Sequence, residues 1–229
     1  MTHCTVYAAS VAPLSDRSLY EAALSAVSPR RREKAARYRQ ERDRRLCLGA
    51  ELLLRQGLRD AGKPYPPALT FGPHGKPYLQ DEGLWFSLSH SGEWALCALA
   101  DREVGCDIEE IRKTDLAIAR RFFTPEEYAR IAAGETPEER QERFFRLWTL
   151  KESFLKVTGR GLSLPLNAFS IQTENGITVT GSAKDRPYSF LEYSDIPDCR
   201  CAVCAEGERV TAPLRILDLA AILQKEESL

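Results

Sequence analysis

Residues 84–109 read LWFSLSHSGEWALCALADREVGCDIE, and this stretch decides the predicted fold. Three strand-like runs lie in it, at 84–89, 94–100 and 104–108, and two short polar turns join them. Apolar or alternating runs of this length between turns are typical of consecutive β-strands. The stretch therefore predicts a β-meander.

The segments on either side mix helical and strand patterns. Helices are expected from Ser28-Pro29, from the apolar stripe Leu46, Ala50, Leu53, Leu54 and Leu58, over 115–133 with a second start at Thr124, and over about 143–158. Further strands are expected at 4–9, 168–173, 176–181, 187–193 and 199–205, with a short element at 213–224. This order favours an α+β fold. The chain also divides near residue 101 into two halves of similar element order, 1–101 and 102–229.

Composition limits the class of protein. The chain has 229 residues, 43% of them hydrophobic, with 32 Lys and Arg against 33 Asp and Glu. No apolar run approaches the roughly 18 residues that cross a bilayer, and the start, MTHCTVYAAS, does not have the pattern of a secretion signal. Seven Cys without such a signal indicate reduced thiols. We expect a cytoplasmic protein with no membrane partner.

A basic segment follows Ser28. Between residues 28 and 45, nine cationic side chains stand against three acidic ones, in a chain whose formal net charge is -1. The cations are Arg30, Arg31, Arg32, Lys34, Arg37, Arg39, Arg42, Arg44 and Arg45. Guanidinium groups pair bidentately with phosphate oxygens, so the segment indicates a phosphate site. The alternatives are a solvated helix face with internal ion pairs and a nucleic-acid-binding module. The nucleic-acid module is disfavoured because no aromatic residues alternate with the cations.

Two acidic side chains fall on one expected strand. Asp107 and Glu109 are two residues apart and face the same side, whereas Cys106 and Ile108 face the other. Neighbouring carboxylates repel each other unless a cation lies between them, and hard oxygen ligands suit Mg²⁺, Mn²⁺ or Ca²⁺. The alternative is a strand end that faces water.

The helix expected at 143–158 carries a third acid. Trp148, Glu152 and Lys156 are spaced i, i+4 and i+8 and share one face, and a different, core-like face carries Phe144, Leu147 and Phe154. Glu152 is thus a candidate third metal ligand, and Lys156 a candidate cation for a phosphate. The alternative is an ordinary surface ion pair.

Two smaller motifs involve His90 and the cysteines near the end of the chain. His90 lies between Ser89 and Ser91 without a G-x-S-x-G elbow, so a phosphate contact fits better than nucleophilic catalysis; a turn His bonded to backbone is the alternative. Cys201 and Cys204 would point to opposite faces of a strand, which disfavours zinc. Taken together, the acids and cations predict metal-assisted phosphoryl-type transfer.

These motifs resemble the 4'-phosphopantetheinyl transferases of the surfactin-synthetase-activating (Sfp) type. The blocks that carry the resemblance are SLSHSGEW (87–94), VGCDIE (104–109), FFTPEEY (122–128), WTLKESFLK (148–156) and GLSLPLNAFS (161–170). Gly75-Lys76-Pro77 and Ser28-Pro29 with Glu33-Lys34 match as well. The similarity runs from about residue 28 to 205 with agreeing order and spacing.

The resemblance implies a pseudo-dimer of two α+β halves around a cleft. It implies a monomeric enzyme that moves the phosphopantetheine arm of coenzyme A to a serine of an acyl or peptidyl carrier protein and releases 3',5'-ADP. The carriers served by this family belong to fatty-acid, polyketide, nonribosomal-peptide or lysine pathways. Family roles transfer to Asp107, Glu109 and Glu152 as Mg²⁺ ligands, with Mn²⁺ an alternative, and to Lys156 at the pyrophosphate. The residues implied at the coenzyme A phosphates and adenine are Arg31, Lys34, Arg45, Lys76, Ser89 and His90.

Some features depart from the family or stay open. Ser87 stands where relatives often have Asn, and Arg31 where they often have Lys. The spacing after Lys34 leaves Arg44 and Arg45 as alternatives at the phosphate. The base that accepts the carrier serine's proton is Glu152, a water it shares with the metal, or Glu127. The acidic carrier is expected to dock near Phe122, Phe123 and 161–165.

Overall fold

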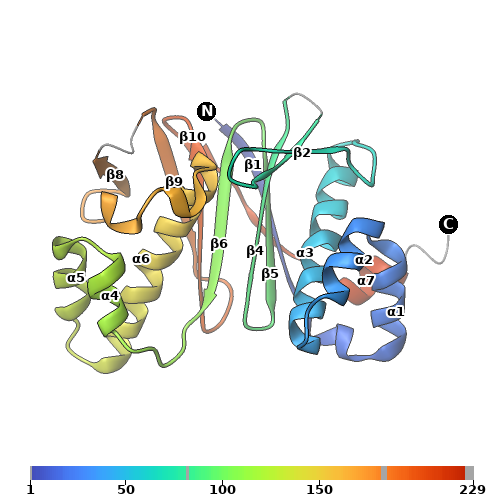
Figure 1. The fold of residues 1–229 in the computed structure, drawn as a ribbon, viewed down its shortest axis with the longest axis horizontal. Helices are drawn as coiled ribbons and strands as arrows, with labels where there is room; N and C mark the ends of the chain where they lie inside the picture. Colours follow the sequence, from blue (N-terminus) through green and yellow to red (C-terminus); the bar gives the residue numbers. More distant parts are fainter. Residues whose placement is uncertain (1, 81–82, 182–184, 225–229) are drawn as a thin grey trace.

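A computed structural model describes residues 2–80, 83–181 and 185–224. Two β-sheets meet in the middle of the molecule, and helices cover the outer side of each (Figure 1). A core of buried side chains from both sheets lies between them, among them Val6, Leu96, Ile108 and Val203. Two further cores are present, one between each sheet and the helices that cover it. The predicted α+β class is confirmed.

The first sheet comes mainly from the first half of the chain. Its order is β11-β1-β5-β4, and β12 also pairs with β1. These strands are β1 (Thr2–Ser10), β4 (Trp85–Ser91), β5 (Trp94–Ala100), β11 (Val210–Thr211) and β12 (Leu214–Ile216). The helical elements beside it are η1 (Ala12–Ser15), α1 (Arg17–Ala26), α2 (Pro29–Ala36), α3 (Glu41–Asp60) and α7 (Leu219–Gln224). The sequence patterns had located β1, β4 and β5 but not α1.

The second sheet has the order β6-β10-β9. Its strands are β6 (Val104–Glu110), β9 (Tyr188–Tyr193) and β10 (Cys199–Glu206), and its helices are α4 (Ala117–Phe122), α5 (Pro125–Ala132) and α6 (Pro137–Thr158). Two small hairpins pair β2 (Leu69–Phe71) with β3 (Pro77–Leu79) and β7 (Phe169–Gln172) with β8 (Thr178–Gly181). The short helical turns η2 (Gly161–Ser163) and η3 (Leu166–Ala168) follow α6.

The predicted meander is half right. β4 and β5 form an antiparallel hairpin in which Ser91 pairs with Trp94. β6 does not continue this sheet, because its ladder partner is β10. The apolar residues of a strand indicate that the strand is buried, but not which strand it pairs with. The predicted pairing of β6 with β5 was therefore wrong.

The two sheets are instead joined by serine hydroxyls. Three alternate residues of β4 accept hydrogen bonds from three alternate backbone N–H groups of β6. The pairs are Ser87 with Cys106 (3.0 Å), Ser89 with Ile108 (3.4 Å) and Ser91 with Glu110 (3.1 Å). Side chains on a strand alternate, so the S-x-S-x-S pattern places all three hydroxyls on one side of β4. We call this set the serine seam.

Helix starts follow the predicted caps, with one correction. The Ser28 and Thr124 side chains accept from the N–H groups of Arg31 and Glu127 as N-caps. The helix expected from residue 143 begins earlier, at Pro137, with Thr136 as its cap. Its first turns carry no apolar stripe, and for this reason the hydrophobic pattern missed them.

The end of the chain returns to the first sheet. β11 and β12 pair with β1, and Leu219 and Leu223 of α7 pack in the core of the first half. Residues 210–224 therefore pack with the first half of the chain, although they follow the second half in sequence. The division into two halves at residue 101 stays a prediction. No helix in the described ranges is long and apolar enough to cross a bilayer.

Candidate active site

A cavity of about 410 Å³ opens between the two halves. It gathers residues from α2, the loop before β3, β4 and the end of α6. Its lining includes Arg31, Lys34, His74, Lys76, Phe86, His90, Glu152, Lys156, Gly159 and Gly161. Six of the predicted site residues are therefore brought to one cavity from distant parts of the sequence.

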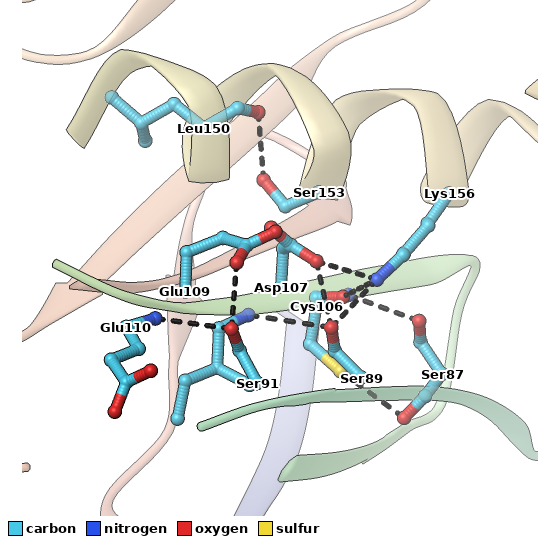
Figure 2. Close-up of polar contacts among 11 residues, drawn as sticks. Ser87, Ser89, Ser91, Cys106, Asp107, Glu109, Glu110, Leu150, Ser153 and Lys156 are labelled. Carbon is cyan, nitrogen blue, oxygen red and sulfur yellow. Dashed lines mark hydrogen bonds and ion pairs between the residues drawn. The ribbon is translucent and has the colours of Figure 1, made fainter. Parts of the chain in front are cut away.

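Lys156 connects this cavity to the acidic strand β6. Its ammonium group donates to Asp107 Oδ1 at 2.6 Å, to Ser89 Oγ at 2.9 Å and to the Cys106 carbonyl at 3.0 Å (Figure 2). Burial opposes the charge on Lys156, but Asp107, Cys106 and Glu152 together outweigh it and the pKa of Lys156 is raised. Lys156 is therefore held as a cation at the edge of the cavity.

Asp107, Glu109 and Glu152 form an acidic group beside Lys156. Asp107 and Glu109 share one face of β6, as predicted. Burial and the charge of Asp107 raise the pKa of Glu109, and the same two causes raise the pKa of Glu152. α6 packs closely on β6, because a Cβ added at Gly105 would collide with the Ser153 carbonyl oxygen. Glu152 is therefore on the helix beside the acidic strand, and its role with Asp107 and Glu109 stays a prediction.

We tested whether this acidic group fits a divalent cation. The described ranges contain no group of three His, Cys, Asp or Glu side chains placed so that it could hold a metal ion. The donor set nevertheless has the right chemistry, because carboxylate oxygens are the ligands that Mg²⁺ and Mn²⁺ prefer. Asp107 Oδ2 is also buried without a hydrogen-bond partner. A buried carboxylate oxygen without a partner is costly unless a cation or water satisfies it, so the residues fit a metal.

Arg31 and Lys34 form the cationic wall of the cavity, from α2. Arg31 Nε donates to Glu51 Oε2 at 2.5 Å. Glu51, which is 6% exposed, also accepts from the Tyr65 hydroxyl at 2.7 Å and the Ser28 N–H at 3.0 Å. These contacts orient the Arg31 guanidinium group where it lines the cavity.

Lys76 and His90 complete the cavity's basic lining. The Lys76 ammonium donates to Glu103 Oε2 at 2.5 Å and to the carbonyl groups of Val104 and Val157. Burial lowers the pKa of Lys76. Burial and the charges of Lys156, Lys34 and Arg31 lower the pKa of His90. His90 is therefore neutral at neutral pH and surrounded by cations, an environment that favours an anionic ligand.

The rest of the basic segment is used differently. Arg44 Nε donates to the Tyr38 carbonyl at 2.9 Å. Arg45 lies outside the lining of this cavity, and its guanidinium is 3.8 Å from Glu93 in the β4–β5 turn. Arg42 pairs with Glu93 and Glu110. Arg42 and Arg45 thus form ion pairs at this turn, as the expected ion-paired helix face predicts, whereas Arg44 bonds to a carbonyl group. The assignment of Arg44 or Arg45 to a phosphate stays a prediction.

Comparison with known proteins decides the family. Residues 13–102 match the family model "4'-phosphopantetheinyl transferase, N-terminal", and residues 103–204 match "4'-phosphopantetheinyl transferase superfamily". A 4'-phosphopantetheinyl transferase of Bacillus subtilis is 35% identical over 80% of this chain and 83% of its own length. The one from Bacillus pumilus is 35% identical over 96% of this chain and 97% of its own. The chain belongs to the 4'-phosphopantetheinyl transferase superfamily. The resemblance inferred from the motifs is confirmed, and this transferase is an enzyme of that class.

The transferase also contains site-supporting residues that sequence reasoning missed. Lys151 is 0% exposed and forms a buried ion pair of 2.8 Å with Glu127. Glu127 Oε1 accepts from the Ile171 N–H at 2.7 Å, and Oε2 accepts from the Thr124 N–H at 2.9 Å. Glu127 is fully buried and both its oxygens are occupied, so this geometry argues against it as the catalytic base. The sequence did not predict that Lys151 is buried, because its ion-pair partner Glu127 lies 24 positions earlier and leaves no local pattern.

The surface expected to meet the carrier needs one correction in this transferase. Phe123 is 3% exposed and packs against Phe144 and Trp148, so it is a core residue. Phe122 is partly exposed and packs edge-on against Trp148. In the 161–165 segment, the Leu162 side chain lies outside the described residues.

The cysteines of the transferase are all free and buried. Cys201 belongs to the core between the two sheets and Cys204 to the core under α6. They point to opposite faces of β10, as the alternation of the strand predicted.

Proposed function

We propose that this transferase moves the 4'-phosphopantetheine arm of coenzyme A onto a serine of an acyl or peptidyl carrier protein and releases 3',5'-ADP. One observation carries the proposal. Lys156 is held 2.6 Å from Asp107, whose other oxygen is buried without a partner, at the edge of a cavity lined by basic side chains. Cations on one side, and on the other carboxylates that would hold a metal, suit a substrate that carries phosphate groups.

The basic lining supports coenzyme A as the co-substrate. Arg31 and Lys34 project from one wall, His90 from β4 and Lys76 from the loop before β3. Charge-assisted hydrogen bonds from such groups to phosphate are stronger than neutral ones. We assign the first three to the phosphate groups of the adenosine end, and Lys76, held by Glu103, to the wall of that subsite.

The metal proposed here is Mg²⁺, with Mn²⁺ also suited to the ligands. Asp107, Glu109 and Glu152 would hold it, and it would supply charge neutralisation at the pyrophosphate. The Lys156 ammonium group would neutralise the same pyrophosphate charge. Removing such a preorganised contact typically costs about 100-fold to 1,000-fold in rate.

The reaction itself is an in-line displacement at phosphorus. The serine oxygen forms a bond to the phosphorus that carries the pantetheine arm, and the bond from that phosphorus to the leaving 3',5'-ADP breaks. The serine proton goes to the Glu152 carboxylate or to a water bound to it.

The carrier partner is proposed to dock partly through charge. Arg112 and Lys113 before α4, and Arg120 and Arg121 in its last turn, are exposed, together with Ile118, which is 40% exposed. A basic surface with an apolar centre complements an acidic helical carrier. We further propose that the transferase acts as a cytoplasmic monomer.

The decisive experiment uses Asp107→Ala with an apo carrier protein, coenzyme A and Mg²⁺, followed by mass spectrometry of the carrier. We expect the added arm to form at least about 100-fold more slowly. Glu110→Gln is the control, because Glu110 is an acid on the same strand that pairs with Arg42 and is not a proposed metal ligand. Near-normal transfer by folded Asp107→Ala would refute the metal assignment. Wild-type protein that adds no arm to any apo carrier would refute the proposed function.

A further inference from the structure

The serine seam does more than join the two sheets. Two of its hydroxyl groups also donate to proposed metal ligands (Figure 2). Ser89 Oγ donates to Asp107 Oδ1 and Ser91 Oγ donates to Glu109 Oε2, each at 2.7 Å. The first half of the chain thus supplies no carboxylate to the acidic group but contacts two of its three members.

We propose that Ser91 is a positioning residue that fixes the Glu109 carboxylate for metal binding. The inference rests on the proposed function, since it concerns the same metal. Ser91 has one hydroxyl proton, and that proton goes to Glu109. Its oxygen at the same time accepts from the Glu110 N–H at 3.1 Å. Because the Ser91 hydroxyl both donates to Glu109 and accepts from the Glu110 N–H, its orientation is fixed. One oxygen of the Glu109 carboxylate is therefore held in place.

The position of Ser91 is itself rigid. Ser91 is the last residue of β4 and pairs with Trp94 across the turn. Gly92 follows with φ of 60° and packs so closely on Glu110 that an added Cβ would lie 2.9 Å from its Oε1. Arg42 Nε donates to the Gly92 carbonyl at 2.7 Å. The turn is therefore clamped against the acidic strand from two sides.

The hydrogen bond from Ser91 to Glu109 gives Ser91 the role of orienting a metal ligand. Groups that hydrogen-bond to a metal ligand orient it and commonly change metal affinity or activity by about 10- to 100-fold when removed. Glu109 is only partly buried and sits on a long side chain with several rotamers. Holding it in one rotamer before the metal arrives removes an entropy cost from binding.

Ser87 provides a matched control within the same seam. Ser87 Oγ accepts from the Cys106 N–H at 3.0 Å, so Ser87→Ala removes one link between the sheets, as Ser91→Ala does. No contact from Ser87 Oγ to a carboxylate is present in the described part of the chain. A purely structural role for the seam predicts the same outcome for both variants.

The test measures Mn²⁺ binding to the transferase without coenzyme A, by electron paramagnetic resonance titration of free Mn²⁺. Wild type, Ser91→Ala, Ser91→Thr, Ser87→Ala and Asp107→Ala are compared, with thermal unfolding recorded for each. We expect Ser91→Ala to weaken binding by about 10-fold or more, Ser87→Ala to bind like wild type, and Ser91→Thr, which keeps the hydroxyl, to recover affinity. The Mg²⁺ concentration that half-activates transfer should rise in the same order, while the KM for coenzyme A stays unchanged.

Two results would overturn the inference, and they are distinguishable. Equal Mn²⁺ affinity of Ser91→Ala and Ser87→Ala, with Asp107→Ala impaired, removes the role of Ser91 and leaves the metal site standing. Wild-type binding that does not depend on Asp107 removes the metal site and the inference together. If Ser91→Ala does not fold, Ser91→Cys, which keeps the size and donates only weakly, is measured in its place.

Discussion

Replacing Lys151 by Met should strongly destabilise the second half of the transferase. The Lys151 ammonium donates to Glu127 Oε2 at 2.8 Å and to the carbonyl groups of Leu166 and Phe169 at 2.6 and 2.7 Å. It also lies 4.2 Å from the centre of the Phe169 ring. All three of its N–H groups are used, and they join α6, α5 and the segment that follows Gly161. That segment begins in the wall of the proposed coenzyme A cavity.

The size of the effect follows from what Lys151→Met leaves behind. Met roughly preserves the volume, so the main loss is electrostatic. Glu127, also 0% exposed, keeps its two backbone donors but loses its counter-charge. Removing one partner of a buried ion pair typically costs about 3–5 kcal/mol. Two buried carbonyl groups also lose a partner, so we expect a value near the upper end, about 5 kcal/mol.

Urea unfolding followed by tryptophan fluorescence measures this effect. Trp148 stacks on Phe144 at 5.6 Å in the same core, so its emission reports on this half. Lys113→Met, at an exposed position, should change the free energy of unfolding by no more than about 0.5 kcal/mol. The double variant with Glu127→Gln should cost less than the sum of the single variants by about 1–3 kcal/mol. A loss below about 1 kcal/mol for Lys151→Met, or additive single variants, would refute the reasoning.

Three further outcomes follow from the same contacts. Because the pKa values of Glu109 and Glu152 are raised, both stay protonated to a higher pH than ordinary carboxylates; transfer should therefore fall on acidification above the usual carboxylate range, and more Mg²⁺ should move that limb of the pH–rate profile to lower pH. Arg31→Ala should raise the KM for coenzyme A by about 10- to 100-fold, the worth of one charged hydrogen bond, and an unchanged KM would exclude Arg31 from the phosphate subsite. Arg31 and the other hydrogen-bond donors around Glu51 outweigh its burial and lower its pKa, so the stability it contributes is present above its unfolded pKa and lost as pH falls; Glu51→Gln should flatten the acid side of the stability curve.

The local geometry of this transferase follows from the order of its residues. Strand alternation fixed that Asp107 and Glu109 share a face, and helical spacing fixed that Glu152 and Lys156 do. Caps at Ser28 and Thr124 started helices where the residue types required it. These features depend on periodicity and on backbone groups a few positions apart, and both can be read from the order of residues.

Which distant elements meet depends on how the whole chain packs. β6 leaves the meander and pairs with β10, and serine hydroxyls of β4 take its free N–H groups. Arg31 turns to Glu51 while Arg45 turns to Glu93, although both stand in one basic run. Lys151 is buried with Glu127, whereas its neighbour Glu152 lines the cavity. A charge or a strand edge is compatible with many partners, and packing of the whole chain selects one of them.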